Sequence, residues 1–86
     1  MAEVRVYTTP ACGYCRRAKA LLDEQGVTYR EIDVATTEGA LEEITALTAQ
    51  RTFPQIVVAD TAIGGYSELS ELVRSDRLQE LLGNGR

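Results

Sequence analysis

The sequence predicts one α/β domain whose elements follow the order strand, helix, strand, helix, strand, strand, helix. Short β-branched runs alternate with segments whose apolar residues recur at helical spacing, which indicates βαβ units. Two close apolar runs near residues 55–63 add a hairpin. With 86 residues and 44% hydrophobic content, the chain has room for a single core. We therefore assign residues 1–86 to one domain, with a four-stranded mixed sheet flanked by three helices.

The first half of the chain reads as a βαβ unit. Residues 4–8 form a β-branched strand, and Pro10 ends it because proline donates no ladder hydrogen bond. Residues 13–25 form a helix with Ala18, Leu21 and Leu22 on its apolar face, and Gly26 supplies its C-terminal stop. Residues 27–34 then form a second strand, which we expect to run parallel to the first.

The second half predicts a helix, a hairpin and a last helix. Thr36 or Thr37 caps a helix whose apolar stripe docks on the sheet through Ala40, Leu41, Ile44 and Leu47. After Pro54, residues 55–59 and 62–63 form two strands joined by a tight turn. Ser67 is the expected cap of a final helix, whose core-facing residues are Leu69, Leu72, Val73, Leu78, Leu81 and Leu82.

Composition argues against several classes of function. Nine basic against 13 acidic residues give a net charge of -4, which opposes binding to nucleic acid. No stretch approaches the roughly 18 apolar residues that span a bilayer, and the first residues lack the apolar run of a signal peptide, so we expect a cytoplasmic protein without a membrane partner. Two cysteines without any histidine fall short of the four ligands of a structural zinc site.

A Cys-x-x-Cys pair stands at the junction of the first strand and helix. Cys12 falls at the helix N-terminus, where free N–H groups and the helix dipole favour a thiolate, so it is the candidate nucleophile. Cys15 shares a helix face with Ala18 and Leu22, which predicts a core-facing resolving thiol within reach of a disulfide. An isolated pair of this kind is also compatible with two small apolar residues, but the flanking strand and helix are typical of a redox motif.

Three segments together resemble the glutaredoxin family: Tyr7-Thr8-Thr9-Pro10-Ala11-Cys12-Gly13-Tyr14-Cys15, Thr52-Phe53-Pro54-Gln55-Ile56 and Ile63-Gly64-Gly65-Tyr66-Ser67-Glu68-Leu69. The similarity covers essentially the whole chain and is greatest to short bacterial dithiol members. It implies a thioredoxin-like fold and a monomeric, glutathione-dependent thiol-disulfide oxidoreductase. The implied substrates are protein disulfides and glutathione mixed disulfides, and no metal is required.

The resemblance also implies a glutathione site beside the cysteines. It is built from the Cys12 loop, the segment before Pro54 and the turn after Gly65. Pro54 would be cis, and the backbone of Phe53 would pair with the peptide of glutathione. The implied contact residues are Thr9, Tyr14, Arg51, Phe53, Pro54, Gly65, Tyr66 and Ser67. On the residues alone, the turn after Gly65 is equally compatible with an ordinary hairpin exit and helix cap.

One departure from the family pattern concerns charge at the site. Many members carry Lys or Arg at the position of Thr9, which supplies no charge here. Arg16, Arg17 or Arg51 would have to compensate. Helix geometry is expected to point Arg16 and Arg17 away from the substrate side.

A second departure is Gly13, which stands where proline is commoner and loosens the first helical turn. Two alternatives follow from it. The chain would hold a [2Fe-2S] cluster in a glutathione-bridged dimer, with Cys12 as a ligand, or it would act like a mycoredoxin with another low-molecular-weight thiol. The segment from Gly64 to Glu68 favours the glutathione branch.

Overall fold

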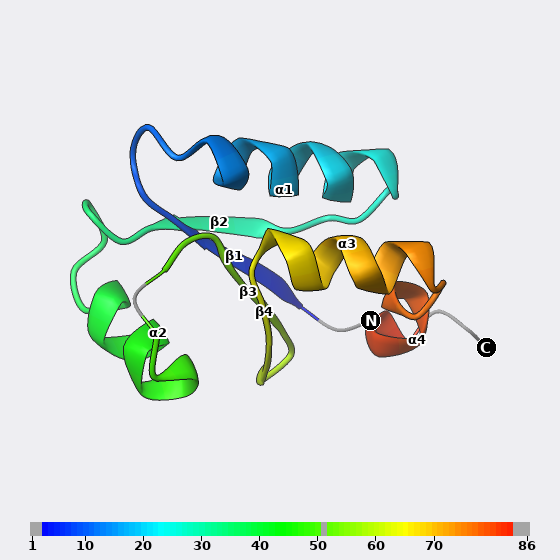
Figure 1. Ribbon diagram of the computed structural model, residues 1–86. Coiled ribbons are helices and arrows are strands. Elements are labelled where there is room, and N and C mark those ends of the chain that lie inside the picture. The colour runs from blue at the N-terminus through cyan, green and yellow to red at the C-terminus, as the bar shows by residue number, and fades with distance from the viewer. Residues whose placement is uncertain (1–2, 51, 84–86) are drawn as a thin grey trace.

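A four-stranded mixed sheet forms the centre of the protein (Figure 1). The computed structural model describes residues 3–50 and 52–83. Strands β2, β1, β3 and β4 lie side by side in that order, with the bounds Arg30–Asp33, Val4–Thr8, Gln55–Val58 and Thr61–Gly64. β1 pairs in parallel with β2 and antiparallel with β3, which pairs antiparallel with β4. The predicted parallel pair and hairpin are therefore confirmed.

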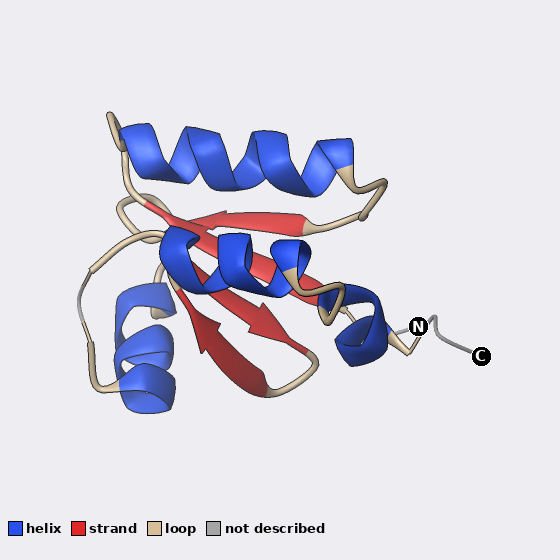
Figure 2. Cartoon of the chain, turned by 45° about the vertical axis from the view of Figure 1, so that its right-hand side comes forward, coloured by secondary structure: helices blue, strands red, loops and turns tan. Residues whose placement is uncertain are grey.

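Helices cover both faces of this sheet (Figure 2). Helices α1 (Gly13–Glu24) and α3 (Tyr66–Arg74) pack on one face with α4 (Leu78–Leu82), and α2 (Ala40–Thr48) packs on the other. Alternate residues of β1 serve the two cores, because successive strand side chains point to opposite faces. Val4 and Val6 join the cluster that contains Ala18, Leu22, Ile56, Val58, Leu69, Leu78 and Leu82, whereas Tyr7 joins Ala40, Ile44 and Val57.

The end of α1 makes β2 shorter than predicted. Gly26 adopts a left-handed conformation with φ 70°, as expected of a helix stop. The Val27 N–H donates to the carbonyl of Leu22 at 3.0 Å, so the helix end uses this backbone group. The strand consequently begins at Arg30, three residues later than the sequence pattern predicts.

The start of α2 also differs from the prediction. Its N-cap is Gly39, with φ 81°, and not Thr36 or Thr37. The N–H groups of both threonines donate to the carbonyl of Asp33, so they form the turn that follows β2. The prediction was wrong because a threonine hydroxyl suits a turn as well as a helix cap.

The last predicted helix is divided into α3 and α4. Asp76 has φ 60°, a left-handed conformation that interrupts the helix between Arg74 and Leu78. Leu78 and Leu82 are nevertheless buried, because the turn sets α4 back against the same core. Within the described residues, no helix is both long and apolar enough to cross a membrane.

Candidate active site

The two cysteines lie where β1 passes into α1. Cys12 is the N-cap of α1, and its backbone is extended, with φ -97° and ψ 108°. Its Sγ accepts the Cys15 N–H at 3.1 Å and forms a disulfide with Cys15, whose Cα lies 5.2 Å away. Cys12 is half-buried, whereas Cys15 is only 2% exposed. This asymmetry is the arrangement predicted for an accessible nucleophile and a core-facing resolving thiol.

A sulfur at this position is chemically activated. The first N–H groups of a helix lack intrahelical partners, and the helix dipole places partial positive charge there. In the reduced protein, both features stabilise a Cys12 thiolate, for which the Cys15 N–H is already aimed. The first turn of α1 contains no acidic residue to oppose this effect.

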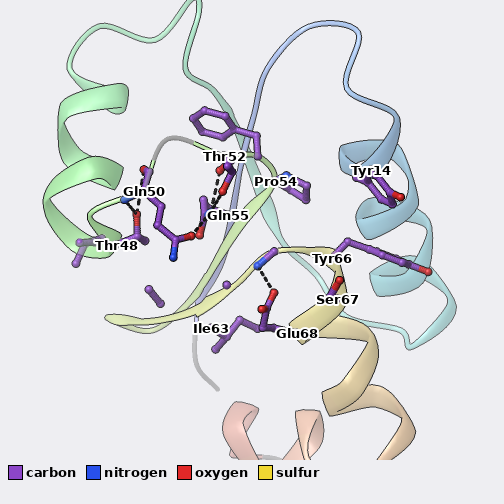
Figure 3. A pocket seen from close by; sticks show the side chains of 15 residues that line it. Tyr14, Thr48, Gln50, Thr52, Pro54, Gln55, Ile63, Tyr66, Ser67 and Glu68 are labelled. Carbon is purple, nitrogen blue, oxygen red and sulfur yellow. Dashed lines mark hydrogen bonds between the residues drawn. The ribbon is translucent and has the colours of Figure 1, made fainter.

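A groove of about 570 Å³ is lined by Tyr14 of α1, the segment before β3 and the start of α3 (Figure 3). Tyr14 and Tyr66 lie at one end, and Thr48 and Gln50 lie at the other. The groove brings together six of the eight residues predicted to bind glutathione: Tyr14, Phe53, Pro54, Gly65, Tyr66 and Ser67. Of the other two, Thr9 lies elsewhere, in a recess described below, and Arg51 lies outside the described residues.

The segment before β3 forms the groove's inner wall. The peptide bond between Phe53 and Pro54 is cis, as the resemblance implied, and Cys12 Sγ lies 3.7 Å from the carbonyl oxygen of Phe53. Gln55 is 2% exposed, and its amide donates to the carbonyl and the hydroxyl of Thr52 at 2.8 and 3.1 Å. A buried glutamine therefore fixes the loop that carries the predicted contact residues.

Sequence reasoning missed the role of Gln55 and misplaced Leu47. The sequence signal for Gln55 is a polar residue that opens an otherwise apolar strand directly after a proline. Leu47 was predicted to dock on the sheet, but its side chain is 41% exposed and lines the groove. Helical periodicity predicts which face of a helix is apolar but not how far along the helix that face is buried, and in α2 the buried residues are Ala40 and Ile44.

The N-terminus of α3 closes the groove on the side of β4. Ser67 was predicted to cap this helix, but the N-cap is Gly65, and the Glu68 carboxylate accepts the Gly65 N–H at 2.9 Å. Gly64 has φ 110°, a conformation that favours glycine. A Cβ on Gly65 would lie 3.2 Å from the carbonyl oxygen of Pro54, so the two glycines let the turn approach the proline loop closely.

Aromatic side chains border the groove near the cysteines. Tyr14 is 58% exposed, and its ring centroid lies 5.9 Å from that of Tyr66. The guanidinium carbon of Arg17 lies 5.3 Å from the Tyr14 centroid, within the range of a cation–π contact. Neither Arg16 nor Arg17 lines the groove, as helix geometry predicted, yet Arg17 reaches its rim through Tyr14.

A second, smaller cavity is lined by the cysteine pair itself. We call it the recess: a hollow of about 240 Å³ lined by Thr8, Thr9, Pro10, Ala11, Cys12, Cys15, Arg16, Lys19, Glu31 and Asp33. Lys19 Nζ donates to both carboxylate oxygens of Glu31 at 3.1 and 3.2 Å, and the Thr8 hydroxyl donates to one of them at 3.0 Å. The Lys19 hydrogen bonds lower the pKa of Glu31, an effect that partial burial opposes and the Thr8 hydrogen bond reinforces.

Comparison with known proteins agrees with this architecture. The glutaredoxin family model matches residues 4–63, a span that includes both cysteines and the proline loop. The chain belongs to the glutaredoxin family. Among curated glutaredoxins, Glutaredoxin 1 of Rickettsia conorii is 42% identical over 81 residues, which cover 92% of this chain and 79% of the relative.

Solved glutaredoxin structures share the fold. The glutaredoxin of Brucella melitensis superposes with a TM-score of 0.83 at 38% identity, covering 100% of this chain and 94% of that one. A buckwheat glutaredoxin, solved as a complex with glutathione, superposes with a TM-score of 0.84 at 28% identity over 95% of this chain and 77% of its own. This glutaredoxin therefore has a thioredoxin-like fold and is a thiol-disulfide oxidoreductase with a disulfide-forming Cys12–Cys15 pair.

Proposed function

We propose that this glutaredoxin uses glutathione to reduce protein disulfides and glutathione mixed disulfides. The observation that carries the proposal is the contact between the half-buried Cys12 and the groove wall: Cys12 Sγ lies 3.7 Å from the carbonyl oxygen of Phe53, a residue that lines the groove. Six residues of the implied glutathione site line that groove, and a relative of the same fold has been solved with glutathione bound. A cytoplasmic location and a monomeric state stay predictions.

In the proposed arrangement, glutathione lies along the groove with its sulfur toward Cys12. The backbone of Phe53 would pair with the glutathione peptide, and the N–H groups at the start of α3 would receive a carboxylate. Tyr14 and Tyr66 would form the outer wall, with Pro54 as the floor and Ser67 beside the carboxylate. Thr9, on the recess side of Cys12, would contribute a hydroxyl, while a role for Arg51 stays a prediction.

The proposed reaction divides the work between the two thiols. Cys12 thiolate attacks the glutathione sulfur of a mixed disulfide, and the target thiolate leaves. A second glutathione thiolate then attacks that sulfur and releases glutathione disulfide and the Cys12 thiolate. Because a stabilised thiolate is a good leaving group, the helix N-terminus favours this release most.

Protein disulfides would use both cysteines. Cys12 forms a mixed disulfide with one substrate sulfur, and the other leaves as a thiolate. Cys15 then gives up its proton to solvent and attacks Cys12 Sγ, which expels the second substrate thiolate and leaves the Cys12–Cys15 disulfide. The buried Cys15 needs little movement for this step, because its N–H already contacts that sulfur. Two molecules of glutathione reduce the Cys12–Cys15 disulfide to the dithiol and leave as glutathione disulfide, which completes the cycle.

Serine variants test this division. Cys12→Ser is expected to abolish turnover in a glutathione-coupled reduction assay, since the remaining thiol, Cys15, is only 2% exposed and is not accessible to the substrate. Cys15→Ser is expected to keep the removal of glutathione from mixed disulfides and to lose the reduction of protein disulfides. Full activity of the Cys12→Ser protein would refute the proposal.

The two alternatives stay predictions and have direct tests. Turnover measured side by side with glutathione and mycothiol decides which thiol serves as reductant. Absorption spectra after anaerobic reconstitution with iron, sulfide and glutathione decide whether a [2Fe-2S] cluster binds, with Cys12→Ser as the control. A colourless product would exclude the cluster.

A further inference from the structure

The carboxylates that line the groove and the recess already have partners. Glu31 accepts hydrogen bonds from Lys19 and Thr8. Asp33 Oδ1 accepts the Ala35 N–H at 2.8 Å, which holds the turn after β2. In the groove, the Glu68 carboxylate accepts the Gly65 N–H. The acidic groups nearest the disulfide are therefore engaged in holding the fold.

The two arginines that follow Cys15, Arg16 and Arg17, differ from these carboxylates because they have no charged partner among the described residues. Both are exposed. Of the four charged side chains that line the recess, Lys19 and Glu31 pair with each other, and Asp33 keeps its negative charge while it holds the turn after β2. Arg16 is thus the cation of the recess that has no ion pair among the described residues.

Arg16 is the better placed of the two for contact with a bound substrate. Its N–H donates to the Cys12 carbonyl at 3.3 Å, so the two residues are one helical turn apart. Side chains with this spacing are neighbours, with Cβ atoms about 5–6 Å apart. Arg16 also lines the recess together with both cysteines. The acidic residue of the recess that lacks a basic partner, Asp33, lies at the end of β2 and accepts the Ala35 N–H of the following turn.

We propose that the recess beside Arg16 selects protein substrates that carry Asp or Glu next to the cysteine that becomes bonded to Cys12. The proposal rests on the proposed reduction of protein disulfides. In the mixed disulfide, the peptide is fixed by its sulfur to Cys12, which lines the recess, so a residue next to the bonded cysteine lies within reach of the recess. With about 240 Å³, the recess has room for one side chain, and Arg16 offers its carboxylate a charged partner.

The test uses peptides with an internal disulfide, in which Glu, Gln or Lys stands directly before or after the first cysteine. The readout is the second-order rate constant for oxidation of the reduced protein, taken as a ratio between peptides, so that any general change in Cys12 reactivity cancels. For at least one of the two positions, we expect the Glu peptide to react about two- to fivefold faster than the Gln peptide, the range of an exposed charge pair. Lys should slow the reaction by a similar factor.

Reversing the charge of Arg16 tests whether this residue recognises the charge of the peptide. Arg16→Glu should reverse the preference, so that the Lys peptide becomes the fastest, and Arg16→Gln should bring the ratios near one. Arg77→Glu makes the same charge change on an exposed residue at the start of α4 and should leave the wild-type ratios intact. Salt at 1 M should also bring the ratios near one, because the Debye length falls to about 3 Å.

Two results would overturn the proposal: equal rates for the three peptides with the wild-type protein, or an unchanged preference in Arg16→Glu. A mixed disulfide of glutathione and 2-mercaptoethanol serves as a separate substrate. Failure to turn over both this compound and all peptides would refute the proposed function itself. Turnover without a charge preference would refute only the role of the recess.

Discussion

Replacing Gly64 with alanine tests how the turn before α3 is held. Gly64 has φ 110°, and a Cβ built on it would lie 2.8 Å from Glu68 Cγ and 2.9 Å from Glu68 Cδ. Glu68 is the residue whose carboxylate accepts the Gly65 N–H. The added methyl group therefore strains the backbone and displaces the side chain that caps the helix.

The expected loss follows from two contributions. An L-residue in a left-handed conformation costs about 1–2 kcal/mol. Displacing the Glu68 side chain removes a hydrogen bond worth about 0.5–1.5 kcal/mol. Gly64→Ala should therefore lower the free energy of unfolding by about 2–3 kcal/mol, which for a domain of this size lowers Tm by about 10–20 °C.

Urea denaturation and thermal unfolding of the reduced protein measure this loss. In a Glu68→Ala background the clash is absent, so the same glycine substitution should cost only the backbone contribution, about 1–2 kcal/mol. Gly13→Ala is the matched control, because a Cβ there meets nothing within 4 Å, and we expect a change of at most about 1 kcal/mol, in the stabilising direction. A Gly64→Ala protein as stable as the wild type, or an equal loss in both backgrounds, would refute the reasoning.

Two further predictions concern stability. The Lys19 hydrogen bonds lower the pKa of Glu31 below its ordinary value near 4.5, so the folded state binds this proton less readily than the unfolded state. The resulting stabilisation is present above pH 4.5 and is lost as the pH falls through the lowered pKa. Urea denaturation between pH 3 and 7 should therefore show that Glu31→Gln loses less unfolding free energy on acidification than the wild type. Equal losses in the two proteins would contradict this assignment. Leu69 is fully buried, so Leu69→Ala should cost about 2–5 kcal/mol of unfolding free energy, whereas Leu81→Ala should cost clearly less, because Leu81 is 41% exposed. Similar losses in the two leucine variants would show that α3 does not anchor the core as described.

Several features of the site follow from residues close together in the sequence. Cys12 precedes the first helical residue, and Cys15 lies on the face of Ala18, so the exposure of one thiol and the burial of the other are consequences of helical spacing. Gly26 likewise stops α1 through its own backbone conformation. Such features depend on interactions within one or two turns, which is why the sequence predicts them.

Other features depend on segments that meet only in the folded chain. Leu47 of α2 lines the groove together with residues of β4 and α3, and Gln55 fixes the proline loop because burial leaves its amide no solvent partner. The Glu68 cap of α3 is different, because Gly65 and Glu68 are only three residues apart: this contact is local, and the sequence prediction chose Ser67 in its place. None of these contacts leaves a periodic pattern in the sequence.

By itself, the sequence determined the order of strands and helices, the redox pair and its asymmetry, because periodicity and helix-end chemistry are local. The tertiary structure decided what surrounds the pair. It placed Thr9 and Arg16 in a recess that Cys12 also lines, and it placed Tyr14 and Pro54 in a separate groove. The physical reason is that each cavity is bounded by elements from separate parts of the chain, whose distances are set by core packing and not by any one segment.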